Sequence, residues 1–112
     1  MKLYHLKTCD TCRKAVKALR AAGYEPDLID VRADGVPAAA LAKIIEMAGW
    51  ETVLNTRSTT WRGLAGADKT DVDGAKALAL MTAHPNLIKR PVIVDGERVT
   101  IGWKAAQQAV WI

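Results

Sequence analysis

The chain has 112 residues, half of them hydrophobic, which is enough to bury a core without disulfides or metals, so we expect one domain over residues 1–112. No run approaches the roughly 20 apolar residues of a membrane-spanning helix, and the N-terminus does not resemble a signal peptide. The formal net charge is +4, but the basic residues are spread along the chain without interleaved aromatic residues. We therefore expect a cytoplasmic monomer that binds neither a membrane nor nucleic acid directly.

The first 35 residues predict a β-α-β unit. Residues 2–6 and 27–31 are short and β-compatible, and each predicts a strand. Residues 10–22 between them have helical periodicity, and Gly23 suits the position just after a helix. The apolar residues expected on the buried face of this helix are Cys12, Ala15, Val16, Leu19 and Ala22. Two strands joined by a helix should be parallel, with a right-handed crossover.

The middle of the chain predicts a helical insert over about residues 36–85. Residues 37–48 predict an amphipathic helix, with Pro37 at its first position. Residues 51–54 can add a helical turn, residues 55–60 predict a polar loop, and a short helix is expected around Trp61. A further helix is expected to begin after a cap at Thr70 and to run through residue 83, with His84 in its last turn and Pro85 as its stop.

The last part of the chain predicts a β-β-α unit. Residues 88–94 predict a buried strand, Asp95 and Gly96 a two-residue hairpin turn, and residues 97–101 the partner strand. Residues 103–111 predict a final helix, expected to pack through the side chains of Trp103, Ala106 and Val110. The whole pattern predicts an α/β fold of the thioredoxin-like, glutaredoxin type: a mixed four-stranded sheet whose β-α-β and β-β-α halves flank the helical insert.

The only two cysteines, Cys9 and Cys12, stand two residues apart where the first strand hands over to the first helix. The free amides and the dipole at a helix N-terminus favour a thiolate, and such a position can lower a cysteine pKa from roughly 8.5 to about 3.5–7.5. In a cytosolic protein this spacing indicates a redox pair or a metal site. Cys12 lies a turn deeper and is either a resolving thiol or a small apolar core residue. A zinc site from these cysteines with His5 and His84 is the metal alternative, but their spacing does not follow a zinc-finger pattern.

Three separated motifs carry a resemblance to a known family. They occupy residues 4–5 with 9–14, residues 54–57 with 61–62, and residues 87–91. With these motifs the chain resembles the arsenate reductase (ArsC)/Spx-type family, and within it the YffB-like branch. The resemblance implies a redox nucleophile at Cys9, anion-binding arginines at Arg57 and Arg90, and a cis-proline at Pro91 that faces the reactive cysteine.

Two further residues match the family pattern and one family feature is missing. His5 matches a histidine whose protonated ring would favour the thiolate, the alternative being a hydrogen-bonded residue at the edge of the core. Arg13 can add charge beside the cysteines, although it and the other arginines could equally be solvated surface residues. Arsenate reducers of this family carry a third arginine after the hairpin, where only Arg98 lies nearby, and this weakens arsenate as the expected substrate.

The hypothesis that follows is a thiol–disulfide oxidoreductase, most simply a glutathione-dependent thiol reductase. It would hold no bound cofactor, use glutathione as a co-substrate and Cys9 as the nucleophile, and be restored by a glutaredoxin or thioredoxin system. The alternatives are a true arsenate reductase and an Spx-type redox-sensing regulator that binds the C-terminal domain of the RNA polymerase α subunit. The absence of a tail after Ile112 weighs against the regulator.

Overall fold

A computed structural model describes residues 1–112 and divides them into two compact units. The sheet unit comprises Met1–Gly35 and Arg90–Ile112, and the helical unit comprises Val36–Lys89. The helical unit corresponds to the predicted insert but extends beyond residue 85, because the Lys89 amide donates to the Val53 carbonyl at 2.9 Å. That residues 1–112 form one domain stays a prediction.

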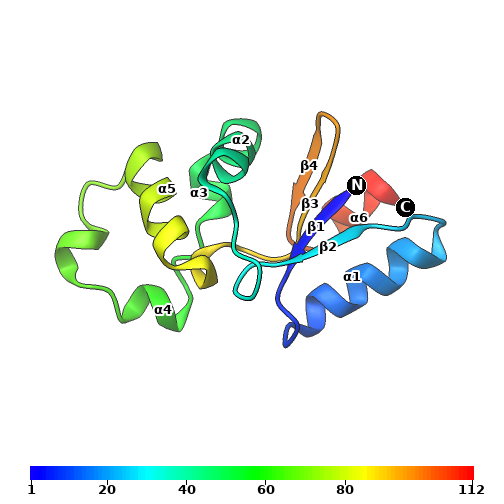
Figure 1. The fold of residues 1–112 in the computed structure, drawn as a ribbon, viewed down its shortest axis with the longest axis horizontal. Helices are drawn as coiled ribbons and strands as arrows, with labels where there is room; N and C mark the ends of the chain where they lie inside the picture. The colour runs from blue at the N-terminus through cyan, green and yellow to red at the C-terminus, as the bar shows by residue number, and fades with distance from the viewer. The chain divides into compact units, whose positions relative to one another are not determined.

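The sheet unit contains the predicted mixed sheet of four strands, in the order β2-β1-β3-β4 (Figure 1). Strand β1 is parallel to β2 and antiparallel to β3, and β3 is antiparallel to β4. The strands are β1 (Lys2–His5), β2 (Asp27–Asp30), β3 (Val92–Asp95) and β4 (Arg98–Ile101). The predicted fold class is therefore confirmed.

Helices α1 (Asp10–Ala21) and α6 (Ala105–Trp111) pack on one face of this sheet. Their contribution to the core is Leu19 and Trp111, which are buried against Leu3 and Ile93, a cross-strand pair of β1 and β3. Helix α1 ends as predicted, with Gly23 at a φ of 97°. Its buried face is Cys12, Ala15 and Leu19, with Val16 half-buried; Ala22 lies beyond the helix and is exposed, contrary to the prediction.

The expected packing of the final helix was wrong. Ala106 and Val110 are exposed, and Trp111 is the buried residue, with Trp103 half-buried beside the core. The helix begins two residues later than predicted because Lys104 is its N-cap, whose amide donates to the Gln107 side chain at 2.9 Å.

The helical unit consists of short helices whose apolar faces meet. They are α2 (Ala38–Ala48), α3 (Trp50–Val53), α4 (Thr59–Arg62), the 3₁₀ helix η1 (Gly66–Lys69), α5 (Gly74–Ala83) and the 3₁₀ helix η2 (Pro85–Leu87). Leu41, Val53 and Met81 are fully buried, in α2, α3 and α5. Helix α2 begins one residue later than predicted, with Pro37 as its N-cap, and the predicted loop over residues 55–60 ends at Ser58, which caps α4.

The cap of α5 differs from the prediction. Asp73, not Thr70, caps the helix by accepting a hydrogen bond from the Lys76 amide at 2.8 Å. The Thr70 hydroxyl donates to the Gly66 carbonyl instead, which closes the turn after η1. At the other end His84 is the C-cap rather than part of the last turn, and Pro85 begins η2.

The predicted strand over residues 88–94 begins only at Val92. Ile88 pairs with Leu54 inside the helical unit, and Pro91 has no N–H to donate to a sheet. The hairpin turn is also shifted by one residue, because Asp95 pairs with Arg98 and the loop is residues 96–97. Gly96 takes a φ of 62°, the first position of a type II′ turn, which favours glycine.

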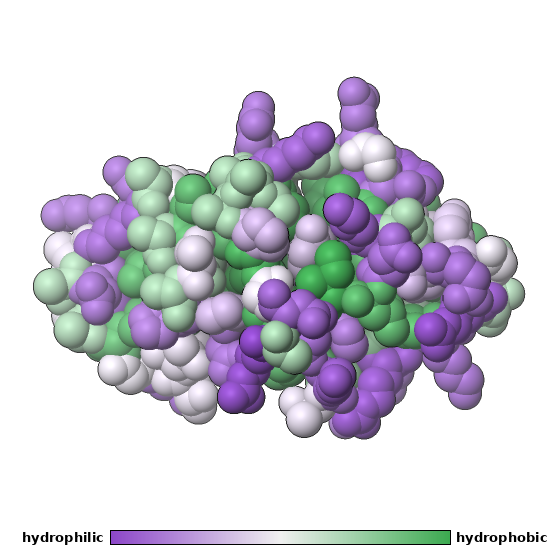
Figure 2. All heavy atoms as spheres, viewed as in Figure 1, coloured by the Kyte–Doolittle hydropathy of each residue, from purple (hydrophilic) through white to green (hydrophobic).

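No helix of the chain combines the length and apolar character needed to cross a bilayer. On the view in Figure 2, hydrophilic side chains gather over α1. The exposed face of that helix carries four basic residues, Arg13, Lys14, Lys17 and Arg20.

Candidate functional site

The turn between β1 and α1 positions Cys9 at the helix N-terminus. The Cys9 amide donates to the Leu6 carbonyl at 2.9 Å, and Cys9 itself is the N-cap of α1 with extended backbone angles. The Arg13 guanidinium reaches back to this turn, where it donates twice to the Lys7 carbonyl, at 3.1 and 3.2 Å, and once to Asp10 at 2.7 Å. Arg13 therefore holds the loop that carries Cys9.

The two thiols occupy unequal environments. Cys9 is half-buried, whereas Cys12 is buried on the inner face of α1 with 1% of its surface exposed, and no disulfide joins them. Partial burial acts to raise the pKa of Cys9, but hydrogen bonds from the thiol and amide of Cys12, together with the charge and a hydrogen bond of Arg90, lower it overall. Burial, together with the neighbouring Cys9 thiolate, raises the pKa of Cys12 to about 12.

Arg90 and Pro91 enter the site immediately before β3. Their peptide bond is cis, as the family resemblance implied, and Pro91 is buried while Arg90 is half-buried. The Pro91 carbonyl accepts a hydrogen bond from the Gly102 amide at 2.9 Å, which attaches this segment to the end of β4. Residues from both ends of the sheet unit thus converge on Cys9, and this environment favours its thiolate form.

Replacing Arg90 with glutamine is expected to raise the pKa of Cys9, because both the positive charge and a hydrogen bond to the thiolate are lost. The pH dependence of Cys9 alkylation by iodoacetamide, followed by mass spectrometry of the labelled peptide, measures this pKa. Arg90→Lys is the matched control, since it keeps the charge and should raise the pKa less. Equal alkylation profiles for the wild type and Arg90→Gln would contradict this account.

His5 lies at the end of β1, opposite Asp30 in β2. His5 is one of the groups that lower the pKa of Asp30, whereas the groups that lower the pKa of Cys9 are Cys12 and Arg90. The role of His5 in favouring the Cys9 thiolate stays a prediction.

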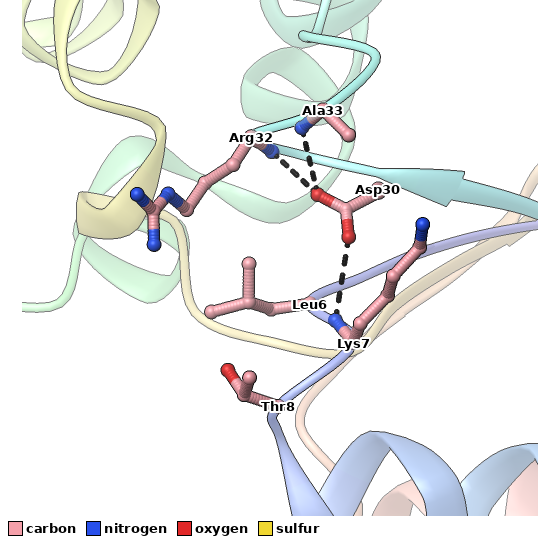
Figure 3. Close-up of a pocket in the computed structure, with 6 residues that line it drawn as sticks. All are labelled: Leu6, Lys7, Thr8, Asp30, Arg32 and Ala33. Atoms are coloured by element: carbon pink, nitrogen blue, oxygen red, sulfur yellow. Dashed lines mark hydrogen bonds between the residues drawn. The ribbon is translucent and has the colours of Figure 1, made fainter.

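Asp30 is a structural residue of the site region that sequence analysis missed. Its buried carboxylate accepts backbone hydrogen bonds from Ala33 at 2.8 Å, Arg32 at 2.9 Å and Lys7 at 3.3 Å (Figure 3). The bond from Ala33 is the largest of several effects that lower the pKa of Asp30. The signal was an aspartate at a strand end before a turn, where its side chain commonly bonds amides two and three residues on.

Replacing Asp30 with alanine is expected to lower the free energy of unfolding by about 1–3 kcal/mol, because it leaves backbone amides without their acceptor. Since the folded-state pKa of Asp30 is lowered, its contribution is present above the unfolded-state pKa of about 3.9 and is lost as the pH falls through the folded-state pKa. Urea unfolding at pH 7 and at pH 3 measures both effects. Asp27→Ala, an exposed position on the same strand, is the control; equal losses in the two variants would refute this role.

Arg57 belongs to the helical unit and is exposed in the loop before α4. Its amide donates to the Asn55 side chain at 3.0 Å, and its carbonyl accepts from Arg62 at 2.9 Å. This loop is therefore locally ordered. A role for Arg57 in binding anions next to Cys9 stays a prediction.

Arg98, the nearest candidate for a third family arginine, is engaged elsewhere. Its guanidinium pairs with Asp95 at 3.2 Å and lies 4.6 Å from the centre of the Trp111 ring. The structure also brings together no group of three or more histidine, cysteine, aspartate or glutamate side chains that could hold a metal ion. The zinc alternative therefore has no set of ligands here.

The structure has a mixed sheet, a cysteine of lowered pKa at the N-cap of α1 and a cis-proline before β3. Together these features define a protein of the thioredoxin-like fold with an accessible cysteine at its first helix. The ArsC family model matches residues 4–110, and the chain belongs to the ArsC family. It is 39% identical over 101 residues to an uncharacterized protein of Haemophilus influenzae, which covers 90% of this chain and 89% of the relative. The solved structure of a YffB protein matches with a TM-score of 0.91 at 41% identity, covering 97% of this chain and 96% of that one.

A regulator is also among the relatives. The chain is 24% identical over 103 residues to the global transcriptional regulator Spx of Lactiplantibacillus plantarum, which covers 90% of this chain and 77% of the relative. These matches confirm the predicted resemblance to the ArsC/Spx-type family and its YffB-like branch. They place the chain in a family whose matched relatives include both an arsenate reductase-related protein and a transcriptional regulator.

Proposed function

We propose that this protein is a glutathione-dependent thiol reductase in which Cys9 is the nucleophile. The observation that carries the proposal is the inequality of the two thiols: the pKa of Cys9 is lowered at the N-cap of α1, whereas burial raises the pKa of Cys12 to about 12. A thiolate, not a thiol, attacks disulfides, so Cys9 is the sulfur that reacts at neutral pH.

The first step is a thiol–disulfide exchange. The Cys9 thiolate attacks the glutathione sulfur of a glutathionylated substrate, a Cys9–glutathione disulfide forms, and the substrate sulfur leaves as a thiolate that takes a proton from water. Arg90 stabilises the thiolate before the attack, and the amide and thiol of Cys12 donate to the same sulfur. No electrons are gained or lost overall in this step, since one disulfide replaces another.

The second step releases Cys9. A glutathione thiolate attacks the glutathione sulfur of the mixed disulfide, oxidised glutathione leaves, and the Cys9 thiolate is restored. Glutathione is favoured over Cys12 for this attack because Cys12 is buried and its pKa of about 12 leaves almost none of it ionised at pH 7. When Cys12 attacks instead, a Cys9–Cys12 disulfide forms, and a glutaredoxin or thioredoxin system would reduce it.

A disulfide substrate is favoured over arsenate because of Arg98. Arsenate is a multiply charged oxyanion that needs several fixed cationic donors. Arg98 is paired with Asp95 and stacked on Trp111, so it does not supply one of them.

The test is a coupled assay with glutathione, glutathione reductase and a glutathionylated peptide as the substrate, in which NADPH consumption reports turnover. We expect turnover that depends on both the protein and glutathione. The proposal is contradicted when the purified, reduced protein gives no turnover above the rate of glutathione alone. Arsenate in place of the peptide tests the true arsenate reductase, and faster turnover with arsenate would favour that function.

The second candidate function is an Spx-type redox-sensing regulator. The pair of cysteines and the match to Spx support it, and the partner would be the C-terminal domain of the RNA polymerase α subunit. A pull-down with that domain under oxidising and under reducing conditions tests it. Binding in only one redox state would support the regulator, and no binding in either state would remove it.

A further inference from the structure

The sheet unit contains an open pocket next to the turn that carries Cys9 (Figure 3). Its volume is about 390 Å³, and it is lined by Leu6, Lys7, Thr8, Asp30, Arg32 and Ala33. These residues lie at the end of, or directly after, the parallel strands β1 and β2, whose carboxyl ends meet at the same edge of the sheet. In open α/β sheets this edge is where ligands commonly bind.

The charge of this pocket favours an anion. Lys7 and Arg32 are exposed cations, and their side chains, like the Thr8 hydroxyl, make no hydrogen bond or ion pair in the structure. In Figure 3 the Arg32, Leu6 and Thr8 side chains extend to the same side of the Asp30 carboxylate, while the Lys7 side chain runs the other way. Arg32 therefore supplies the cation on the side of the pocket where the Leu6 and Thr8 side chains lie.

The one acidic group of the pocket does not oppose an anion strongly. The Asp30 carboxylate is 5% exposed, and three backbone amides donate to its two oxygens. Those donors face the carboxylate and offset its charge locally. The surface that a ligand meets on this side is set instead by the Arg32 guanidinium and the Thr8 hydroxyl.

We propose that this pocket binds a carboxylate of the disulfide that reacts with Cys9, with Arg32 as the main cation. Thr8, which lines the pocket, and Cys9 are neighbours in the chain, with Cα atoms about 3.8 Å apart, so the pocket begins next to the residue that carries the reacting sulfur. A guanidinium suits this ligand because its planar fork matches a carboxylate. The proposal rests on the proposed function and adds a substrate class to it: disulfides that carry carboxylates close to sulfur.

The experiment compares three small disulfides of similar size: 3,3′-dithiodipropionate, which is anionic, bis(2-hydroxyethyl) disulfide, which is neutral, and cystamine, which is cationic. In each reaction the Cys9 thiolate attacks one sulfur, a Cys9 mixed disulfide forms, and the other half leaves as a thiolate that takes a proton from water. Stopped-flow mixing with quenching and intact-mass analysis gives the second-order rate constant. In the wild type we expect the rate constant to be largest for the anionic disulfide, smaller for the neutral one and smallest for the cationic one. In Arg32→Gln, the ratio of the anionic to the neutral rate constant should fall three- to fivefold.

The anionic-to-neutral ratio of rate constants does not depend on the intrinsic reactivity of Cys9, because that reactivity affects both rate constants equally. Lys17→Gln is the matched control, because it removes one positive charge from the exposed face of α1, and it should keep the wild-type ratio. If the ratio is unchanged in Arg32→Gln, or falls equally in Lys17→Gln, the proposal that this pocket binds a carboxylate is wrong. The proposed function of Cys9 is not affected by either result. Failure of Cys9 to react with even the neutral disulfide overturns the proposed function itself.

Discussion

Cys9→Ser will reduce the glutathione-dependent turnover of a glutathionylated peptide to the rate without protein. A serine hydroxyl is not ionised at neutral pH, and no other sulfur can replace Cys9, since Cys12 is buried and its pKa is about 12. The coupled glutathione reductase assay measures the loss. Retention of turnover in Cys9→Ser would show that the nucleophile lies elsewhere.

Cys12→Ser separates the two routes of resolution. When glutathione resolves the intermediate, this variant keeps turnover, because the serine hydroxyl can still donate to the Cys9 sulfur in place of the Cys12 thiol. Cys12→Ala is the matched control, because it removes this donor. In that variant the pKa of Cys9 should rise, and turnover should fall most at low pH, where less of Cys9 is ionised. Complete loss of turnover in both variants, with a Cys9–glutathione adduct accumulating by intact mass, would instead make Cys12 the obligate resolving thiol.

The parts of this fold that could be predicted from sequence are those governed by neighbouring residues. The β-α-β unit follows from two short apolar runs, a periodic helix and a glycine after its end, all within 35 residues. The position of Cys9 at the helix N-terminus follows from the same local pattern. The cis bond before Pro91, by contrast, came from the family resemblance and not from composition or spacing.

The errors arose where distant segments decide the structure. Ile88 continued an apolar run and looked like sheet, but its pairing partner is Leu54, which lies 34 residues earlier in the chain (88 − 54). The importance of Asp30 depends on amides from two loops, one of which follows β1. The role of Arg57 in binding anions next to Cys9 also remains a prediction, because it depends on how Arg57 lies relative to a distant part of the chain.

In the C-terminal helix, too, contacts with distant segments decide which residue is buried. A substitution in this helix is also expected to give the largest change in stability. Periodicity favoured Val110 as the buried residue, yet Trp111 is 4% exposed and Val110 is 42% exposed. The Trp111 ring packs edge-on against Tyr24 at 6.4 Å, and its Nε1–H donates to the buried Thr100 hydroxyl at 2.8 Å. Size and an internal hydrogen-bond partner thus decide which neighbouring residue is buried, and neither is visible as periodicity.

Trp111→Ala is therefore expected to lower the free energy of unfolding by about 3–5 kcal/mol, a large share of the roughly 5–15 kcal/mol of a typical domain. The change removes the largest side chain of the sheet-unit core and leaves the buried Thr100 hydroxyl without its donor. Urea unfolding followed by far-ultraviolet circular dichroism measures it without relying on tryptophan fluorescence. Val110→Ala is the matched control and should change the free energy by less than about 0.5 kcal/mol. Similar losses of free energy in the two variants would mean that α6 packs through both residues. That result would support the prediction from sequence that Val110 lies on the buried face of the helix.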